Sequence, residues 1–108
     1  MTTKQIKSVI KKLPHSECRV PFTYHHNYLR GNCPALAGWS RADIANSTVK
    51  FDNQELYALA LCQIIDLADP FDIVLTVFTD EDRAIIRECT TLAKERVAFY
   101  NRKFANVK

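Results

Sequence analysis

The chain contains very little glycine, with only two residues in 108. Tight turns between β-strands depend on glycine, so an all-β fold would need more of it. The scarcity of glycine therefore favours helices. It also excludes a glycine-rich phosphate-binding loop, because such a loop needs several glycines in one short stretch.

Long hydrophobic runs are absent as well. The longest apolar stretch, around 56–65, is much shorter than the roughly 20 residues of a membrane-spanning helix. The first residues, Met-Thr-Thr-Lys-Gln-Ile, lack the apolar core of a secretory signal. The four cysteines are too few and too scattered for the disulfide framework of a small secreted protein. We therefore expect a cytoplasmic protein with free thiols and no membrane association.

The length and composition are typical of one ordinary globular domain. A chain of 108 residues can bury a hydrophobic core without metals or disulfides. Its contents of 47% hydrophobic and 25% charged residues are also ordinary. No internal repeat or low-complexity tract divides the chain, so we expect a single domain over 1–108.

Charge is sorted along the chain. Residues 1–50 contain eight Lys and Arg and two acids, which gives a net charge of +6. Residues 51–90 contain nine acids and two Arg, a net charge of −7. Residues 91–108 contain five Lys and Arg and one acid, a net charge of +4. Such a pattern concerns association with partners more than it concerns the fold.

Apolar periodicity and start signals predict the helices. The predicted segments are 3–13, 23–30, 41–46, 53–68, 71–78 and 80–104. The first is amphipathic, with Thr3 as its cap and Pro14 beyond its end, and Gly31 ends the second. Capping boxes of the form Ser-x-x-Asp and Asp-x-x-Glu precede the third and the fourth.

The segment at 53–68 is apolar around most of its circumference, which is typical of a central, buried helix. The residues at 71–78 are rich in β-branched side chains, so a strand there is the alternative. A lone strand would have nothing to pair with, which favours a helix. The predicted fold is an all-α domain of four to six helices, with a buried central helix at about 53–68 and a long C-terminal helix at about 80–104. An α+β fold is the alternative.

Two regions in the first half of the chain are candidate partner-binding surfaces. The first helix presents Lys4, Lys7 and Lys11 opposite its apolar residues. The segment 22–32 combines aromatic rings, imidazoles and a guanidinium, which anchor interfaces and stack on nucleic-acid bases. Its candidate residues are Tyr24, His25, His26, Tyr28 and Arg30. The alternative is a solvated lysine face and a set of core aromatic residues.

The last helix carries a third candidate surface. Arg83, Arg87 and Lys94 fall on one stripe with Asn101 and Lys108, at spacings of four and seven residues. Such a stripe can follow a phosphate backbone or an acidic protein face. Ordinary solvation is the alternative.

Arg96 falls within the apolar arc of the same predicted helix. A guanidinium in that position has three possible environments. We expect it to extend to solvent, to pair with a buried acid such as Asp66, or to contact a partner.

Histidine and cysteine gather in the irregular segment 15–33. A tetrahedral zinc site could take ligands from His15, Cys18, Cys33 and either His25 or His26. The paired Cys/His knuckles of zinc domains are absent, however, and a chain of this size needs no metal to fold. We therefore expect individually packed thiols and imidazoles, with no metal and no cofactor.

No catalytic arrangement emerges from the sequence. A Cys–His pair could be drawn from the same segment, but no third residue orients it. We therefore expect a non-catalytic interaction protein that binds and regulates or inhibits a protein or nucleoprotein complex, with an acidic partner suiting its basic surfaces. The alternative is direct DNA or RNA binding by the N-terminal lysine face and the C-terminal Arg/Lys stripe. A small zinc module or an enzyme ranks below both.

Overall fold

The computed structural model describes residues 1–13, 21–46, 52–68 and 78–105. These residues form α1 (Thr3–Lys11), α2 (Pro21–Asn32), the short 3-10 helix η1 (Pro34–Leu36), α3 (Arg41–Ala45), α4 (Asn53–Ala68) and α5 (Asp80–Phe104). The described part contains no strand, and the predicted all-α class is confirmed.

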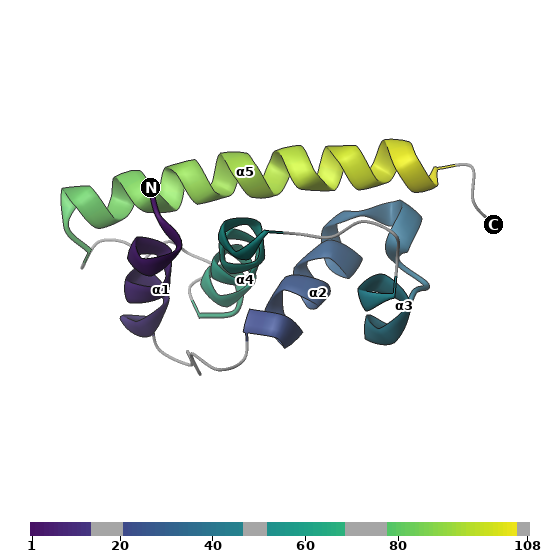
Figure 1. Cartoon of the computed structure of the whole chain (residues 1–108), viewed down its shortest axis with the longest axis horizontal. Coiled ribbons are helices and arrows are strands. Elements are labelled where there is room, and N and C mark those ends of the chain that lie inside the picture. The colour runs from purple at the N-terminus through teal and green to yellow at the C-terminus, as the bar shows by residue number, and fades with distance from the viewer. Residues whose placement is uncertain (14–20, 47–51, 69–77, 106–108) are drawn as a thin grey trace.

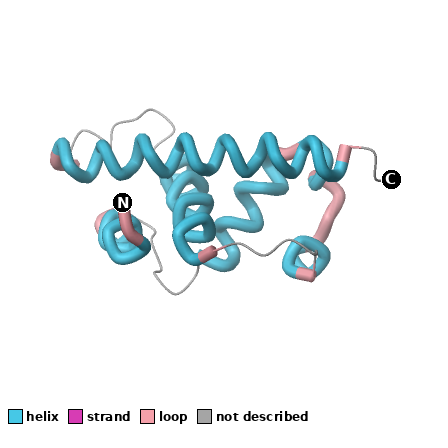
Figure 2. The backbone as a smooth tube through the Cα atoms, turned by 45° about the horizontal axis from the view of Figure 1, so that its top comes forward, coloured by secondary structure: helices cyan, strands magenta, loops and turns pink. Residues whose placement is uncertain are grey.

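The helices form two layers. α5 extends along one side of the molecule, and α1, α4 and α2 lie against it (Figures 1 and 2). α4 packs against α1, α2 and α5, so it is the central helix that the sequence predicts. The longest dimension of the molecule is 43 Å. The 25 residues of α5 account for most of that length, at about 1.5 Å per residue.

The core consists of two clusters of buried side chains that meet at α4. One cluster joins α1 to α4 and to the N-terminal half of α5. The other joins α2, η1 and α3 to α4 and to the C-terminal half of α5. α4 contributes Ala58, Leu61 and Ile64 to the first cluster, and Leu59 and Cys62 to the second. An apolar surface around most of α4 is therefore what allows it to contact three helices at once.

α1 begins and ends earlier than the sequence predicted. Its cap is Thr2 instead of Thr3, because Thr2 forms a capping box with Gln5. The Gln5 N–H donates to Thr2 Oγ1 at 3.2 Å, and the Thr2 N–H donates to Gln5 Oε1 at 2.8 Å. The helix ends at Lys11, two residues before the predicted end.

α2 is longer than predicted at both ends. Pro21 occupies its first position, where a missing N–H costs nothing. Gly31 lies inside the last turn and does not end the helix. The side-chain amide of Asn32 donates to the Tyr28 carbonyl at 2.9 Å, which satisfies one of the unpaired carbonyls at this end.

The predicted helices at 41–46, 53–68 and 80–104 match α3, α4 and α5 to within one residue. Ser40 caps α3 as predicted, since its hydroxyl accepts the Asp43 N–H at 3.1 Å. The segment 71–78 lies almost entirely outside the described residues, so the choice between helix and strand there stays a prediction. No helix in the described part combines the length and apolarity that crossing a membrane requires.

Substitutions in α4 test its central position. Leu59 is fully buried, whereas Leu67 on the same helix is 58% exposed. We expect Leu59→Ala to lower the free energy of unfolding by about 2–5 kcal/mol, because it leaves a cavity in the core. Leu67→Ala is the matched control and should change it by less than about 0.5 kcal/mol. Urea denaturation followed by circular dichroism measures both values; equal losses would contradict the assigned burial.

Candidate functional site

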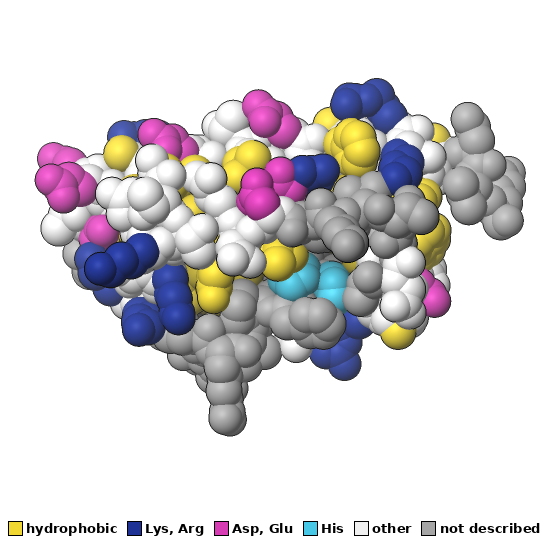
Figure 3. Space-filling view, in the orientation of Figure 1, with side chains coloured by type: hydrophobic (Ala, Val, Ile, Leu, Met, Phe, Trp, Pro, Cys, Tyr) yellow, Lys and Arg dark blue, Asp and Glu magenta, His cyan; other side chains and the backbone are white. Residues whose placement is uncertain are grey.

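The lysine face of α1, made of Lys4, Lys7 and Lys11, is a continuous exposed surface. All three side chains are exposed, while Ile6 and Ile10 on the opposite side of the helix are buried. None of the three lysines forms an ion pair with another described residue. Figure 3 shows basic side chains gathered over α1 at one end of the molecule. The helix is therefore anchored by its apolar side and presents to solvent three cations that have no acidic partner among the described residues.

An ion pair fixes this helix to the first turn of α5. Lys12 Nζ lies 2.7 Å from Asp82 Oδ2. The hydrogen bond from Lys12 is the main cause that lowers the pKa of Asp82, and the Thr79 side chain lowers it further. Asp80 and Glu81 are exposed in the same turn of α5. The lysine face thus adjoins an acidic helix end.

The two basic ends of the chain do not merge into one patch. Arg102 and Lys103 lie 20 and 21 residues along α5 from Asp82, which corresponds to roughly 30 Å. In Figure 3 basic side chains lie at both ends of the long axis, with the acidic end of α5 beside α1. The fold therefore keeps the sorting of charge that the sequence shows.

Three of the five candidate residues in the segment 22–32 lie inside the molecule. His25 and His26 are each 2% exposed and Tyr28 is 7% exposed, because α2 packs closely on α4. The two imidazole rings meet at a centroid distance of 4.2 Å. This burial leaves little surface for a partner at the three residues. Tyr24 and Arg30 are partly exposed and stay candidates.

Burial also shifts the acid–base properties of this segment. It is the main cause that lowers the pKa of His26, and Arg41 and Arg30 lower that pKa further. Burial likewise raises the pKa of Tyr28 to about 12. Both groups are therefore neutral at neutral pH, as interior side chains usually are.

Only part of the candidate zinc ligand set can be placed. His15 and Cys18 lie outside the described residues. The Cys33 thiol is buried and donates to Asn101 Oδ1 at 3.0 Å. Among residues 1–13, 21–46, 52–68 and 78–105, no three His, Cys, Asp or Glu side chains are close enough together to hold a metal ion.

The predicted stripe on the last helix is interrupted. Asn101 is partly buried against η1, where it accepts from Cys33 and, at 3.5 Å, from the Ala35 N–H. Arg83 lies 3.4 Å from Asp80 one turn away. Arg87 and Lys94 are exposed. Lys108 lies outside the described residues, so the observed part of the stripe is three cations at the surface and an amide that packs inward.

Arg96 pairs with an acid, although not with the one that the sequence suggested. Its guanidinium contacts Glu55 in the first turn of α4 instead of Asp66. It also lies 5.3 Å from the centre of the Phe99 ring. Both members of the ion pair are mostly buried, with side chains 19% and 16% exposed. Arg96 therefore connects α5 to α4, and Glu55 compensates its charge.

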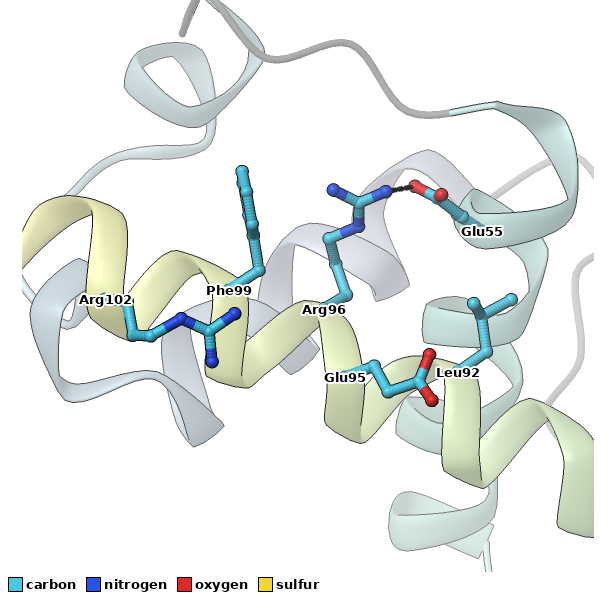
Figure 4. Close-up of a pocket in the computed structure, with 6 residues that line it drawn as sticks. All are labelled: Glu55, Leu92, Glu95, Arg96, Phe99 and Arg102. Carbon is cyan, nitrogen blue, oxygen red and sulfur yellow. Dashed lines mark hydrogen bonds and ion pairs between the residues drawn. The ribbon is translucent and has the colours of Figure 1, made fainter.

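An open groove of about 280 Å³ lies beside this ion pair. Its lining residues are Glu55, Leu92, Glu95, Arg96, Phe99 and Arg102 (Figure 4). Only Arg96 was among the candidate site residues from the sequence; the other five, Glu55, Leu92, Glu95, Phe99 and Arg102, were not. The position of Arg96 in the apolar arc of α5 was the sequence feature that pointed to this site. A guanidinium in such an arc indicates a place where two surfaces meet.

Comparisons of the chain with protein-family models, with curated proteins and with solved structures gave no match.

The Lys12–Asp82 pair predicts a pH dependence of stability. A pKa that is lower in the folded state contributes stability above the unfolded value of 3.8. This contribution is lost as the pH falls through the lower folded pKa. The difference in unfolding free energy between the wild type and Asp82→Asn should therefore be constant at neutral pH and shrink below about pH 4.

Urea titrations at a series of pH values measure this difference. Asp80→Asn is the matched control, since Asp80 lies in the same turn with a fully exposed side chain. It should change the stability at neutral pH by less than about 0.5 kcal/mol. A wild-type advantage over Asp82→Asn that stays constant down to about pH 2 would contradict the assigned pair.

Proposed function

We propose that this chain is a non-catalytic interaction protein that binds a protein or nucleoprotein complex through the lysine face of α1 and regulates or inhibits it. The observation that carries the proposal is the exposure of Lys4, Lys7 and Lys11 without an acidic partner among the described residues. Cations held on one side of an anchored helix attract an acidic surface and fix its orientation.

The arrangement of charge favours a protein that contacts α1 with an acidic surface over a nucleic acid that extends along the whole molecule. A duplex that followed both basic ends would pass the exposed acids at the start of α5, which repel phosphate. A protein surface can present its acids to α1 alone. The interrupted stripe on α5 supports the same choice.

The three cysteines that the structure describes support a non-catalytic role. Cys33, Cys62 and Cys89 are buried. Burial raises the pKa of Cys62 to about 11 and that of Cys89 to about 12. A thiol is a nucleophile only as the thiolate, which these surroundings disfavour.

Charge reversal on α1 tests the proposal. We expect the triple substitution Lys4→Glu, Lys7→Glu and Lys11→Glu to weaken partner affinity at least about tenfold. It should leave the unfolding free energy within about 1.5 kcal/mol of the wild type, because all three side chains are exposed. The measurement is affinity capture from the native host followed by quantitative mass spectrometry.

A second variant, Arg87→Glu with Lys94→Glu, makes the same kind of charge change on α5. Loss of the same captured proteins with the α1 variant alone would support the proposal, and equal capture by the α1 variant and the wild type would exclude this surface. The alternative is direct nucleic-acid binding. It predicts that a labelled DNA duplex or single strand binds the wild type with a steep salt dependence and that both variants weaken it.

A further inference from the structure

The C-terminal half of α5 carries an unusual set of residues on its solvent side, of which Phe99 also packs against the core at the edge of the groove. Figures 1 and 2 show the other helices packed on one side of α5. Glu95, Ala98 and Arg102 are exposed and Phe99 is partly exposed. Spacings of three, four and seven residues place these four side chains on one face of the helix. We refer to them as the α5 outer face.

The two charged side chains of this face are not engaged in ion pairs within the described part of the chain. Neither Glu95 nor Arg102 forms an ion pair with another described residue. Arg96, by contrast, is paired with Glu55 and held beside Phe99. The α5 outer face thus has one acid and one base, seven residues apart, that are available to a partner.

A helix face with an acid and a base seven residues apart is complementary to a second, antiparallel copy of itself. When two such helices pack antiparallel about a twofold axis, Glu95 of one copy lies opposite the partner's Arg102, and the reciprocal pair forms at the same time. The axis then passes between Ala98 and Phe99, midway between the two charges. The small side chain of Ala98 allows the two helix backbones to approach closely.

The same register brings an aromatic ring to the groove. With Glu95 opposite the partner's Arg102, the partner's Phe99 lies opposite Ala98, close to Arg96 and Phe99 at the groove of the first copy (Figure 4). The groove volume of about 280 Å³ is ample for this ring, since a cavity of roughly 150 Å³ holds benzene. Aromatic rings that meet in this way add stability beyond the area that they bury.

We propose that two copies of this chain associate through the α5 outer face as an antiparallel, twofold-symmetric dimer. Glu95 of each copy pairs with the partner's Arg102, and the two Phe99 rings meet at the grooves. A contact along half of one helix is small, and interfaces below about 1,200 Å² are typical of weak association. We therefore expect a dissociation constant of micromolar order. The lysine face of α1 lies outside this contact, so dimerisation is independent of the proposed function.

Sedimentation velocity of the full chain tests the dimer. The wild type should move from the 12.4 kDa monomer towards twice that mass as its concentration rises, over a range up to about 0.5 mM. Glu95→Arg alone and Arg102→Glu alone each place like charges opposite one another. Each should raise the dimer dissociation constant at least about tenfold. An equimolar mixture of the two variants should restore the dimer, because each of the two pairs across the axis then joins one base to one acid.

Glu88→Arg is the matched control. Glu88 is exposed on α5, two turns before Glu95, and the position opposite it in the proposed register lies past the C-terminal end of α5. This variant should dimerise like the wild type. A wild type that stays monomeric throughout, single variants that dimerise as well as the wild type, or a mixture that stays monomeric would each overturn the proposal.

Discussion

The burial of α4 is the constraint on which the rest of the structure depends. Its side chains enter both core clusters, so α1, α2 and α5 are all placed by packing against it. Burying one large aliphatic side chain contributes about 1.5–3 kcal/mol. Leu59, Leu61 and Ile64 are each no more than 1% exposed. The surfaces proposed for binding lie on α1 and α5, the helices that α4 holds at the outside of the molecule.

Much of the charge pattern follows from the same architecture. Acidic residues lie at the N-terminal ends of several helices. There they accept hydrogen bonds from free N–H groups or interact favourably with the positive end of the helix dipole. Asp43 caps the Ser40 N–H, Asp52 accepts from Glu55, and Asp82 pairs with Lys12. Asp52 and Asp82 belong to the acidic middle of the chain, so part of that negative charge has a structural role. The three lysines of the α1 face form no ion pair within the described ranges of the chain, which is why this face carries the proposed function.

The sequence predicted those parts of the fold that depend on local interactions. Capping boxes and apolar periodicity are encoded within a few residues, so α3, α4 and α5 were located to within one residue. Contacts between residues far apart in the sequence could not be predicted from such local patterns. The pairing of Arg96 with Glu55, and the burial of His25 and His26, both depend on how α5 and α2 pack on α4. The groove beside Phe99 was missed for the same reason, since it forms only where α4 meets α5.

Amide hydrogen exchange measured residue by residue tests the central position of α4 most directly. If α4 is the helix on which the others pack, the amides of Leu59, Leu61 and Ile64 exchange only through global unfolding. Their protection should then equal the unfolding free energy from urea titration, and α1 and α3 should exchange faster through local opening. Exchange of the α4 amides at the rates of α1 and α3, well below global protection, would contradict this account.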